Sequence, residues 1–549
     1  MFQLKENHKQ KMELKFFSCK LLSYLLCLSL GFFPSINSAE FFDCITSKLS
    51  SNFTSTDIVI TPDDTSYSTI LQSTIQNLRY STDKTLKPLA IITPFSYYHV
   101  QSTIICSKAS GLQIRIRSGG HDDEGLSYTS HDHTPFILLD MSKLRSVTVD
   151  LDDNTAWVES GATIGELYYW VSQKSNLLGF PAGECPSVGV GGHLSGGGFG
   201  TMARKYGLSA DNVIDAYIVD VNGRILDRNS MGEDLFWAIR GGGGSFGVVL
   251  SWKISLVYVP PVVTVFSLSK KLDRSGTQIV NKWQYVAHNL TEDLFIHLVI
   301  NLAPVSEQEQ SRTLQLTINA LFLGTADKLI EIVEDRFPEL GLQKTDCIEM
   351  SWIESVVYFS GYLSGEGIDA LRDRSLRPWP KSYSVAKSDY VKKPIPEEAF
   401  EDIWKWCLQE NLLLVIEPFG GRMSEIDATE TPYAHREGNL YIIQYIMRWT
   451  DDDFKASKKH VDLIREIYEK MTPFVSSNPR EAYVNVRDLD LGTNGKGGCG
   501  SSYEHALEWG SKYFMGNFRR LAIVKGEVDP TNFFGHEQSI PPLVLSYSY

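Results

Sequence analysis

Positive charge is scarce relative to negative charge in this chain of 549 residues. Its 52 lysines and arginines stand against 66 aspartates and glutamates, which gives a formal net charge of -14 at pH 7. This balance argues against nucleic acid and anionic membrane surfaces as partners, because both repel an acidic protein. The chain also contains no internal repeat and no low-complexity segment. We therefore expect a soluble globular protein that is long enough for two or three domains.

Long hydrophobic runs are also missing, apart from one near the N-terminus. Residues 21–33 are mostly apolar, but this run is too short to span about 30 Å of hydrocarbon comfortably. Lysines precede it, and Pro34 and small residues follow it. This order favours a signal peptide at residues 1–39, with cleavage near Ala39, over a membrane anchor. We expect the secretory pathway, with a vacuole, an endoplasmic reticulum-derived vesicle or the extracellular space as destination, and no membrane association after cleavage.

Cysteine is sparse, and two of the eight cysteines lie in the expected signal peptide. The six that remain are Cys44, Cys106, Cys185, Cys347, Cys407 and Cys499. A secreted protein can form disulfides, but spacing alone does not pair these cysteines. The two glycosylation sequons, which begin at Asn52 and Asn289, suit the same compartment.

No Gly-x-Gly-x-x-Gly motif follows the first predicted strand, which argues against a nicotinamide cofactor. The chain does show a regular alternation of apolar strands and helices. Strands are predicted at 90–93, 114–117, 136–139, 155–158, 213–220 and 247–253, and helices at 97–111 and 164–175. A short helical cap is expected at 40–85. The pair Pro260 and Pro261 marks a boundary, beyond which we expect a second sheet-based domain with helices at 326–337 and 454–471.

Two glycine-rich runs are the most informative part of the sequence. The run 117–128 reads Arg-Ser-Gly-Gly-His-Asp-Asp-Glu-Gly-Leu-Ser-Tyr, and the run 183–200 contains Cys185 followed by a cluster of glycines. Backbone N–H groups of residues without a Cβ can form an anion-binding nest, which suits a pyrophosphate. The alternative is a set of tight turns that need positive φ, and both interpretations can hold. Taken alone, His121 is a capped turn histidine and Cys185 a buried thiol or disulfide partner.

In this order, the two runs resemble the flavin site of the berberine bridge enzyme family, within the larger vanillyl-alcohol-oxidase-type FAD fold. The resemblance extends from residue 41 to residue 542 and includes motifs at 179–183, 188–200, 204–208, 235–240 and 532–542. It implies an α+β fold in which a two-part FAD-binding domain of the vanillyl-alcohol-oxidase/PCMH type carries an inserted α/β substrate domain built on an antiparallel sheet. The expected parts are an FAD-binding domain at 40–260, a substrate-binding domain at 261–481, and a C-terminal segment at 482–549 that returns to the FAD domain. Within the family, the run 136–166 is most similar to alkaloid oxidases of plants.

The resemblance implies FAD that is attached at two points, with His121 bonded to the 8α-methyl carbon of the flavin and Cys185 to its C6. The residues expected to contact the cofactor are His121, Cys185, Ser118, Gly119, Gly120, Asp122, Ser127, Gly183, Val188, Gly189, Val190, Gly192, His193, Gly197, Gly198, Gly200, Val248 and Asn485. No metal ligand is expected. In the family, a valine at the position of Val190 accompanies reoxidation of the flavin by oxygen, so Val190 favours an oxidase that releases hydrogen peroxide. The alternative is an ordinary buried valine.

The substrate side departs from the family pattern. Asp123 and Val486 stand where many relatives have tyrosine, and Ile442 replaces a lysine that is common in relatives that oxidise alcohols. Berberine bridge enzyme has a glutamate where this chain has Gln444. Oxidation of an alcohol needs a base for the hydroxyl proton, whereas the lone pair of a neutral amine can expel hydride without one. The missing bases therefore favour an amine substrate; the alternatives are that another residue supplies the base or that activity has been lost.

Four residues are the candidates for the substrate side. Glu417 is expected on a strand that lines the cavity, where its carboxylate holds a cationic amine or accepts its proton; the alternative is a solvated strand end. Gln444 is expected to orient the substrate, and Tyr206 and Tyr483 match family positions near the flavin. Asp123 is a further candidate, unless it only caps backbone N–H groups of its turn. The aromatic residues Trp352, Tyr358 and Trp449 are interpreted as packing residues.

Together these features predict an FAD-dependent oxidase that takes a hydride from the carbon next to the amine of a plant alkaloid. Oxygen is the expected electron acceptor and hydrogen peroxide the expected product. Two alternatives stay open. One is oxidation of an alcohol, carbohydrate or monolignol hydroxyl group. The other is a flavin-bearing protein that no longer oxidises and serves as a binding or cyclisation scaffold.

Overall fold

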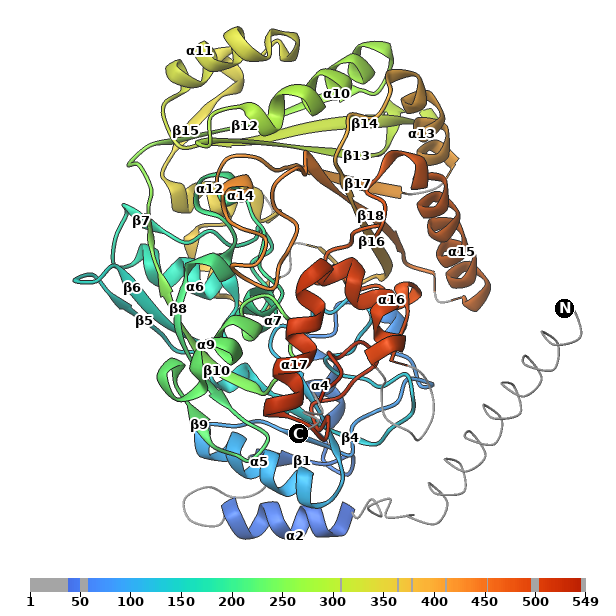
Figure 1. The fold of residues 1–549 in the computed structure, drawn as a ribbon. Coiled ribbons are helices and arrows are strands. Elements are labelled where there is room, and N and C mark those ends of the chain that lie inside the picture. Colours follow the sequence, from blue (N-terminus) through green and yellow to red (C-terminus); the bar gives the residue numbers. More distant parts are fainter. Residues whose placement is uncertain are drawn as a thin grey trace, which may run out of the picture.

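The computed structural model describes residues 38–49, 58–306, 309–362, 365–376, 379–409, 412–451, 453–494 and 503–544. Residues 1–37 of the expected signal peptide, Asn52 and Cys499 lie outside this part of the chain. None of the helices in the described residues combines the length and apolar composition needed to span a bilayer. The described chain forms two halves (Figure 1). We call residues 38–259 with 482–544 the split half, and residues 260–481 the inserted half.

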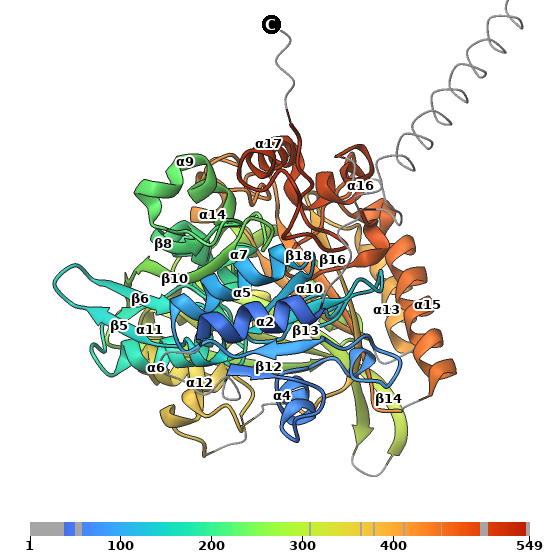
Figure 2. The same ribbon diagram turned by 90° about the horizontal axis from the view of Figure 1, so that it is seen from below.

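The first sheet of the split half has the strand order β1-β2-β4-β3. Strands β2 (Ala90–Ile92), β4 (Phe136–Asp140) and β3 (Gln113–Arg117) run parallel, and β1 (Val59–Ile60) pairs antiparallel with β2. Parallel strands need a crossover connection, and helix α5 (Tyr97–Ala109) connects β2 to β3, which lie on either side of β4. Helix α2 (Ser38–Leu49) lies against α5, as Figure 2 shows, and the Cys44–Cys106 disulfide joins the two helices.

The second sheet of the split half is antiparallel, with the order β5-β6-β10-β8-β9. Its strands are β5 (Val147–Asp150), β6 (Thr155–Glu159), β8 (Val213–Val219), β9 (Ile225–Leu226) and β10 (Val248–Ser255). Short elements fill the connection from β6 to β8: α6 (Ile164–Ser172), β7 (Leu178–Gly179), α7 (Val190–Ser195) and α8 (Ala203–Tyr206). Strand β11 (Val257–Tyr258) pairs with β7. Helix α4 (Tyr67–Ser73) precedes the first sheet, and α9 (Arg228–Ile239) follows β9.

The inserted half is built on one antiparallel sheet of seven strands, with the order β15-β12-β14-β13-β17-β18-β16. The strands are β12 (Val263–Lys271), β13 (Leu294–Ser306), β14 (Glu309–Phe322), β15 (Ile348–Met350), β16 (Tyr383–Val391), β17 (Leu412–Pro418) and β18 (Tyr441–Trp449). Helices α10 (Arg274–Val286), α11 (Ala326–Arg336), α13 (Glu397–Gln409) and α15 (Phe454–Lys470) cover its outer side in Figure 1. Helices α12 (Trp352–Phe359) and α14 (Arg422–Glu425) lie nearer the split half.

Side chains alternate across β17 and β18, which decides what faces the split half. Leu414 and Ile416 are buried against Trp283 and Phe400 of the covering helices, so Glu417 points to the opposite face of the sheet. Because Gln444 is paired with Val415 in the antiparallel register, it shares the face of Glu417.

The C-terminal segment packs against the split half, as the red and green ribbons in Figure 1 show. Helix α16 (Tyr503–Phe514) contacts α17 (Phe518–Val528), and α17 contacts α9. The buried Lys525 ammonium donates to the backbone oxygen of Ser245, at 2.5 Å, and pairs with Asp529, at 2.6 Å. Phe534 enters the core of the parallel sheet.

The strands and helices predicted from the sequence are confirmed to within a few residues. Predicted helices 97–111 and 164–175 correspond to α5 and α6, and 326–337 and 454–471 to α11 and α15. The six predicted strands correspond to β2, β3, β4, β6, β8 and β10. The α+β fold class and the antiparallel sheet of the inserted half are also confirmed.

Candidate active site

A cavity of about 500 Å³ lies where the two halves meet. The split half contributes β3, the turn at 118–127, residues of the 184–200 run and the glycine-rich segment 243–249. The inserted half contributes side chains of β16, β17 and β18. Residues 483–487 and 534–536 of the C-terminal segment complete the wall. The cavity therefore joins segments that are far apart in the sequence.

His121 and Cys185 approach a common neighbour beside this cavity. His121 Nε2 lies 3.0 Å from Ser187 Oγ, and Cys185 Sγ lies 3.5 Å from the same oxygen. Burial raises the pKa of the Cys185 thiol, so the sulfur is a thiol near neutral pH in this environment. The structure thus brings together the two side chains that sequence reasoning selected as attachment points.

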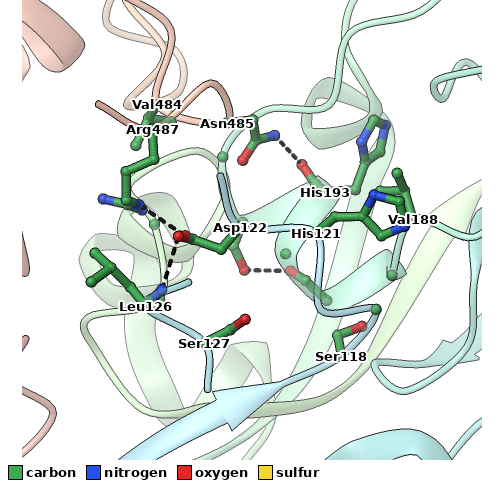
Figure 3. Close-up of a pocket in the computed structure, with 18 of the residues that line it drawn as sticks. Ser118, His121, Asp122, Leu126, Ser127, Val188, His193, Val484, Asn485 and Arg487 are labelled. Atoms are coloured by element: carbon green, nitrogen blue, oxygen red, sulfur yellow. Dashed lines mark hydrogen bonds and ion pairs between the residues drawn. The ribbon is translucent and has the colours of Figure 1, made fainter. Parts of the chain in front are cut away.

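The turn after β3 is fixed by Asp122. Its Oδ1 accepts hydrogen bonds from the backbone N–H groups of Glu124 and Leu126, at 3.1 and 3.0 Å. Its Oδ2 accepts one from Arg487 Nε at 3.1 Å, which ties the turn to the C-terminal segment, as Figure 3 shows. The backbone-capping role considered for Asp123 therefore belongs to its neighbour Asp122.

Glycines form the floor of the cavity for two different reasons. A Cβ added at Gly119 would lie 2.3 Å from the Gly189 nitrogen, and one at Gly189 would lie 2.1 Å from Ser118 Oγ, so two backbone segments touch there. At Gly192, Gly243 and Gly244, in contrast, an added Cβ would meet no protein atom within 4 Å. The second group leaves open space that a bound molecule can fill.

His193, Asn485 and Tyr483 form one hydrogen-bonded group at the cavity wall. The Asn485 amide donates to the His193 backbone oxygen at 3.0 Å and to the Tyr483 hydroxyl oxygen at 3.1 Å. That hydroxyl oxygen also accepts the backbone N–H groups of Gly198 and Phe199. Burial raises the pKa of Tyr483 to about 12 and lowers that of His193 to about 4, so both are neutral near pH 7.

Most of the predicted cofactor residues line the cavity. Those in the wall are His121, Ser118, Gly119, Gly120, Asp122, Ser127, Val188, Gly189, Gly192, His193, Gly200 and Asn485. Those outside the wall are Cys185, Gly183, Val190, Gly197, Gly198 and Val248. Val190 is fully buried in the core at the start of α7. Its side chain therefore lies beneath the residues that line the cavity and does not face the cavity itself.

The substrate candidates divide in the same way. Glu417, Gln444 and Tyr483 line the cavity, but Tyr206 does not; its hydroxyl donates to the backbone oxygen of Tyr258. The three aromatic residues interpreted as packing do lie outside the cavity wall. Trp352 packs edge-on against Tyr168, and Trp449 stacks on Tyr383.

A pair of carboxyl groups stands at the inserted-half end of the cavity. Glu417 Oε2 accepts a hydrogen bond from Gln444 Nε2 at 2.7 Å. Burial raises the pKa of Glu417 to about 7, with a further contribution from the negative charge of Glu184. Burial alone raises the pKa of Glu184 to about 7. His297 Nδ1, on β13, lies 3.6 Å from Glu184 Oε1.

Sequence reasoning missed Glu184 and His297 as members of this group. Glu184 lies in the run 183–200, directly before Cys185, and its charge beside a thiol was a usable signal. For His297 no sequence signal pointed to the cavity, because its position depends on the pairing of β13 with β17. Asp123 also lines the cavity, and burial, together with Asp122 and Glu124, raises its pKa to about 8.

Two protein-family models match the chain: "FAD binding domain" over residues 88–229 and "Berberine and berberine like" over residues 482–541. O-acetylstemmadenine oxidase of Catharanthus roseus is 49% identical over 96% of this chain and 97% of its own length. Monolignol oxidoreductase AtBBE-like 13 of Arabidopsis thaliana is 48% identical over 94% of this chain and 96% of its own length. The solved structure of berberine bridge enzyme from Eschscholzia californica matches with a TM-score of 0.84 and 42% identity, over 92% of this chain and 99% of that one. The chain therefore belongs to the berberine bridge enzyme-like family of FAD-dependent oxidases.

Proposed function

We propose that this oxidase takes a hydride from the carbon next to the nitrogen of a tertiary amine in an alkaloid, leaving an iminium ion. The observation that carries the proposal is the substrate end of the cavity. It holds the carboxyl group of Glu417, whereas Val486 in the wall and Ile442, which is paired with Glu417 across the sheet, carry no group that can act as a base. A carboxylate in a partly closed cavity attracts a cationic amine.

The residues of the split half fit FAD. Gly192, Gly243 and Gly244 leave open space over the cavity floor, and Ser127 Oγ is buried without a hydrogen-bond partner, as is expected where a ligand supplies one. We propose that His121 and Cys185 hold the flavin covalently and that the glycine backbone binds its pyrophosphate. When bound, FAD supplies the acceptor for the two electrons of the hydride and passes them to oxygen.

The side chains of the inserted half perform the binding and the proton chemistry. Above pH 7 the Glu417 carboxylate is ionised, and its hydrogen bond from Gln444 fixes its direction. A substrate ammonium that reaches this carboxylate is held by charge and hydrogen bonding. Its nitrogen must lose the proton before the lone pair can expel the hydride, and an ionised carboxylate at this position accepts that proton.

Two relatives support an amine substrate by their names, O-acetylstemmadenine oxidase of Catharanthus roseus and tetrahydroberberine oxidase of Berberis wilsoniae. A second candidate function is oxidation of an alcohol, as in the monolignol oxidoreductase. One observation favours it. Burial raises the pKa of Glu184 to about 7, and a carboxyl group with that pKa is a suitable general base for a hydroxyl proton at neutral pH.

We also propose the secretory pathway as the location. The Cys44–Cys106 disulfide supports an oxidising compartment. Asn289, which begins a glycosylation sequon, is exposed at the end of a short helical turn.

The proposed function is tested by mixing the purified yellow protein, without oxygen, with N-methyltetrahydroisoquinoline, tetrahydroberberine, coniferyl alcohol or glucose. Bleaching of the flavin by the amines, followed by peroxide release when oxygen is admitted, is the expected result. Bleaching by the alcohol or the sugar, and never by an amine, would overturn the proposal in favour of alcohol oxidation. No bleaching and no peroxide with any compound would instead identify a flavin-bearing scaffold.

A further inference from the structure

The carboxyl pair at the end of the cavity consists of Glu184 and Glu417. In the described residues, no lysine or arginine forms an ion pair with Glu184 or Glu417. The Glu184 side chain is 33% exposed but its Oε1 is buried, and a carboxylate with a buried oxygen is normally paired with a cation. Because no lysine or arginine of the described residues pairs with them, the two carboxyl groups point to a ligand that brings the positive charge.

His297 supplies an independent sign that the group is incomplete. The side chain is only 5% exposed, and its Nε2 lies 3.1 Å from the Asn319 amide nitrogen. Because that nitrogen donates, the neutral ring carries its hydrogen on Nδ1. Nδ1 has no hydrogen-bond partner and points toward Glu184 Oε1, which is also buried without one. The separation of 3.6 Å is too long for a hydrogen bond.

The other titratable groups around the pair do not neutralise it. Burial lowers the pKa of His297, so the ring is uncharged near pH 7. Tyr168 of α6 and Tyr483 of the C-terminal segment lie close enough to interact with the pair electrostatically, and burial raises the pKa of both phenols. These three groups are uncharged at neutral pH and do not neutralise the pair. Arg448 of β18 is a cation that also lines the cavity, and its charge acts on Asp123 and Cys185.

We propose that Glu184 and Glu417 together form a receptor for the ammonium group of the substrate. Glu417 is held by Gln444 on β18, and Glu184 is carried by the segment that precedes Cys185, so the receptor spans both halves. A single positive charge placed against both carboxyl groups supplies the cationic partner that no lysine or arginine of the described residues provides. No group of three or more metal-binding side chains occurs in the described residues, which favours an organic cation over a metal ion.

The receptor also gives the ammonium proton a destination. In the transfer, the N–H bond breaks, an O–H bond forms on one carboxylate, and the electron pair stays on nitrogen. The second carboxyl group keeps the nitrogen in place while the first becomes neutral. The role of the pair as proton acceptor rests on the proposed amine oxidation. Binding of a cation by the two glutamates can be tested without turnover.

The test uses the flavin-loaded protein and benzyltrimethylammonium, whose quaternary nitrogen has no lone pair and forms no iminium. Affinity is measured by calorimetry at pH 5.5 and pH 8, with neopentylbenzene as the uncharged compound of the same shape. We expect the cation to bind about tenfold more tightly at pH 8, because both carboxyl groups are then ionised. The uncharged compound is expected to bind equally at both pH values.

The variants Glu184→Gln and Glu417→Gln are each expected to weaken cation binding at pH 8 about fivefold or more. Glu398→Gln, an exposed carboxyl group on α13, is the matched control and is expected to bind as the wild type does. An unchanged affinity in Glu184→Gln would overturn the pair, and so would cation binding that does not depend on pH in the wild type. The wild-type measurement needs no variant, so it stands if Glu184→Gln fails to fold.

The outcomes separate this inference from the proposed function. If the amines are not oxidised but the cation binds through both glutamates, the receptor is supported and amine oxidation is excluded. If the amines are oxidised but both variants bind the cation as the wild type does, amine oxidation is supported and the receptor is excluded.

Discussion

The two walls of the cavity are built from different parts of the polypeptide. The split-half wall contains many glycines, which expose backbone to the cavity at points where two segments touch or where space stays open. The inserted-half wall consists of side chains on alternate positions of β16, β17 and β18. A backbone wall depends on close approach and tolerates few substitutions, whereas a side chain on a formed strand can be changed without moving the strand. The first wall is thus suited to a constant cofactor and the second to a variable substrate.

The sharpest test of this contrast is Gly189→Ala. Its Cβ would lie 2.1 Å from Ser118 Oγ and 2.2 Å from the Gly119 nitrogen, so the segments must separate, at a cost of about 3 kcal/mol or more. We expect loss of nearly all flavin absorbance together with a lower melting temperature. Gly192→Ala is the control, because its Cβ meets no protein atom: it should melt as the wild type does but hold less FAD. A Gly189→Ala protein with full flavin content and stability would refute the view of a rigid backbone wall.

The next largest effects concern the attachment points. His121→Ala is expected to keep flavin bound through Cys185, and Cys185→Ser to keep it through His121, with reduction by an amine slowed about tenfold in each. The double variant is expected to release all flavin on denaturation. The measurement is the mass of the proteolytic peptides, with Cys407→Ser, a buried thiol on α13, as control. Peptides of the wild type without added flavin mass at either residue would exclude covalent attachment.

On the substrate wall, Glu417→Gln should change binding more than catalysis. Because the pKa of Glu417 is raised to about 7, the group is charged above that pH and neutral below it. We expect the apparent KM for a tertiary amine to rise about tenfold at pH 8, with no change at pH 5.5. The value of kcat should stay close to that of the wild type, because Glu184, the other carboxyl group of the pair, then accepts the ammonium proton. Glu425→Gln, on the exposed side of α14, serves as control. Equal KM values for Glu417→Gln and the wild type at pH 8 would show that Glu417 does not bind the substrate ammonium.

The smallest effect expected is on stability. The pKa of Glu184 is raised in the folded protein to about 7, above its ordinary value of 4.5. Such a shift disfavours the folded state increasingly as pH rises from 4.5 through 7, and has no effect below 4.5. Glu184→Gln without ligand should therefore melt about 2 °C higher than the wild type at pH 8 and equally at pH 4.5. A lower melting temperature at pH 8 would show that the ionised carboxylate has a stabilising partner.

The same contrast explains what the sequence could predict. Strands such as β4 and helices such as α15 come from local apolar patterns, and the glycine runs carry their own conformational signal, so both were predictable. The pairing of His297 with Glu184 depends on the sheet register and on how the halves meet, which no local pattern contains. Val190 and Tyr206 were assigned to the site by family position, but packing places one in the core and directs the other to Tyr258.

All seven strands of the large sheet come from one uninterrupted stretch, residues 263–449, whereas the flavin-facing segments flank it on both sides. In evolution, the residues of this stretch can change, or the stretch can be replaced as a whole, while the flavin-facing segments stay the same. Chimaeras that carry this stretch from a related oxidase offer a direct way to transplant substrate preference within the family.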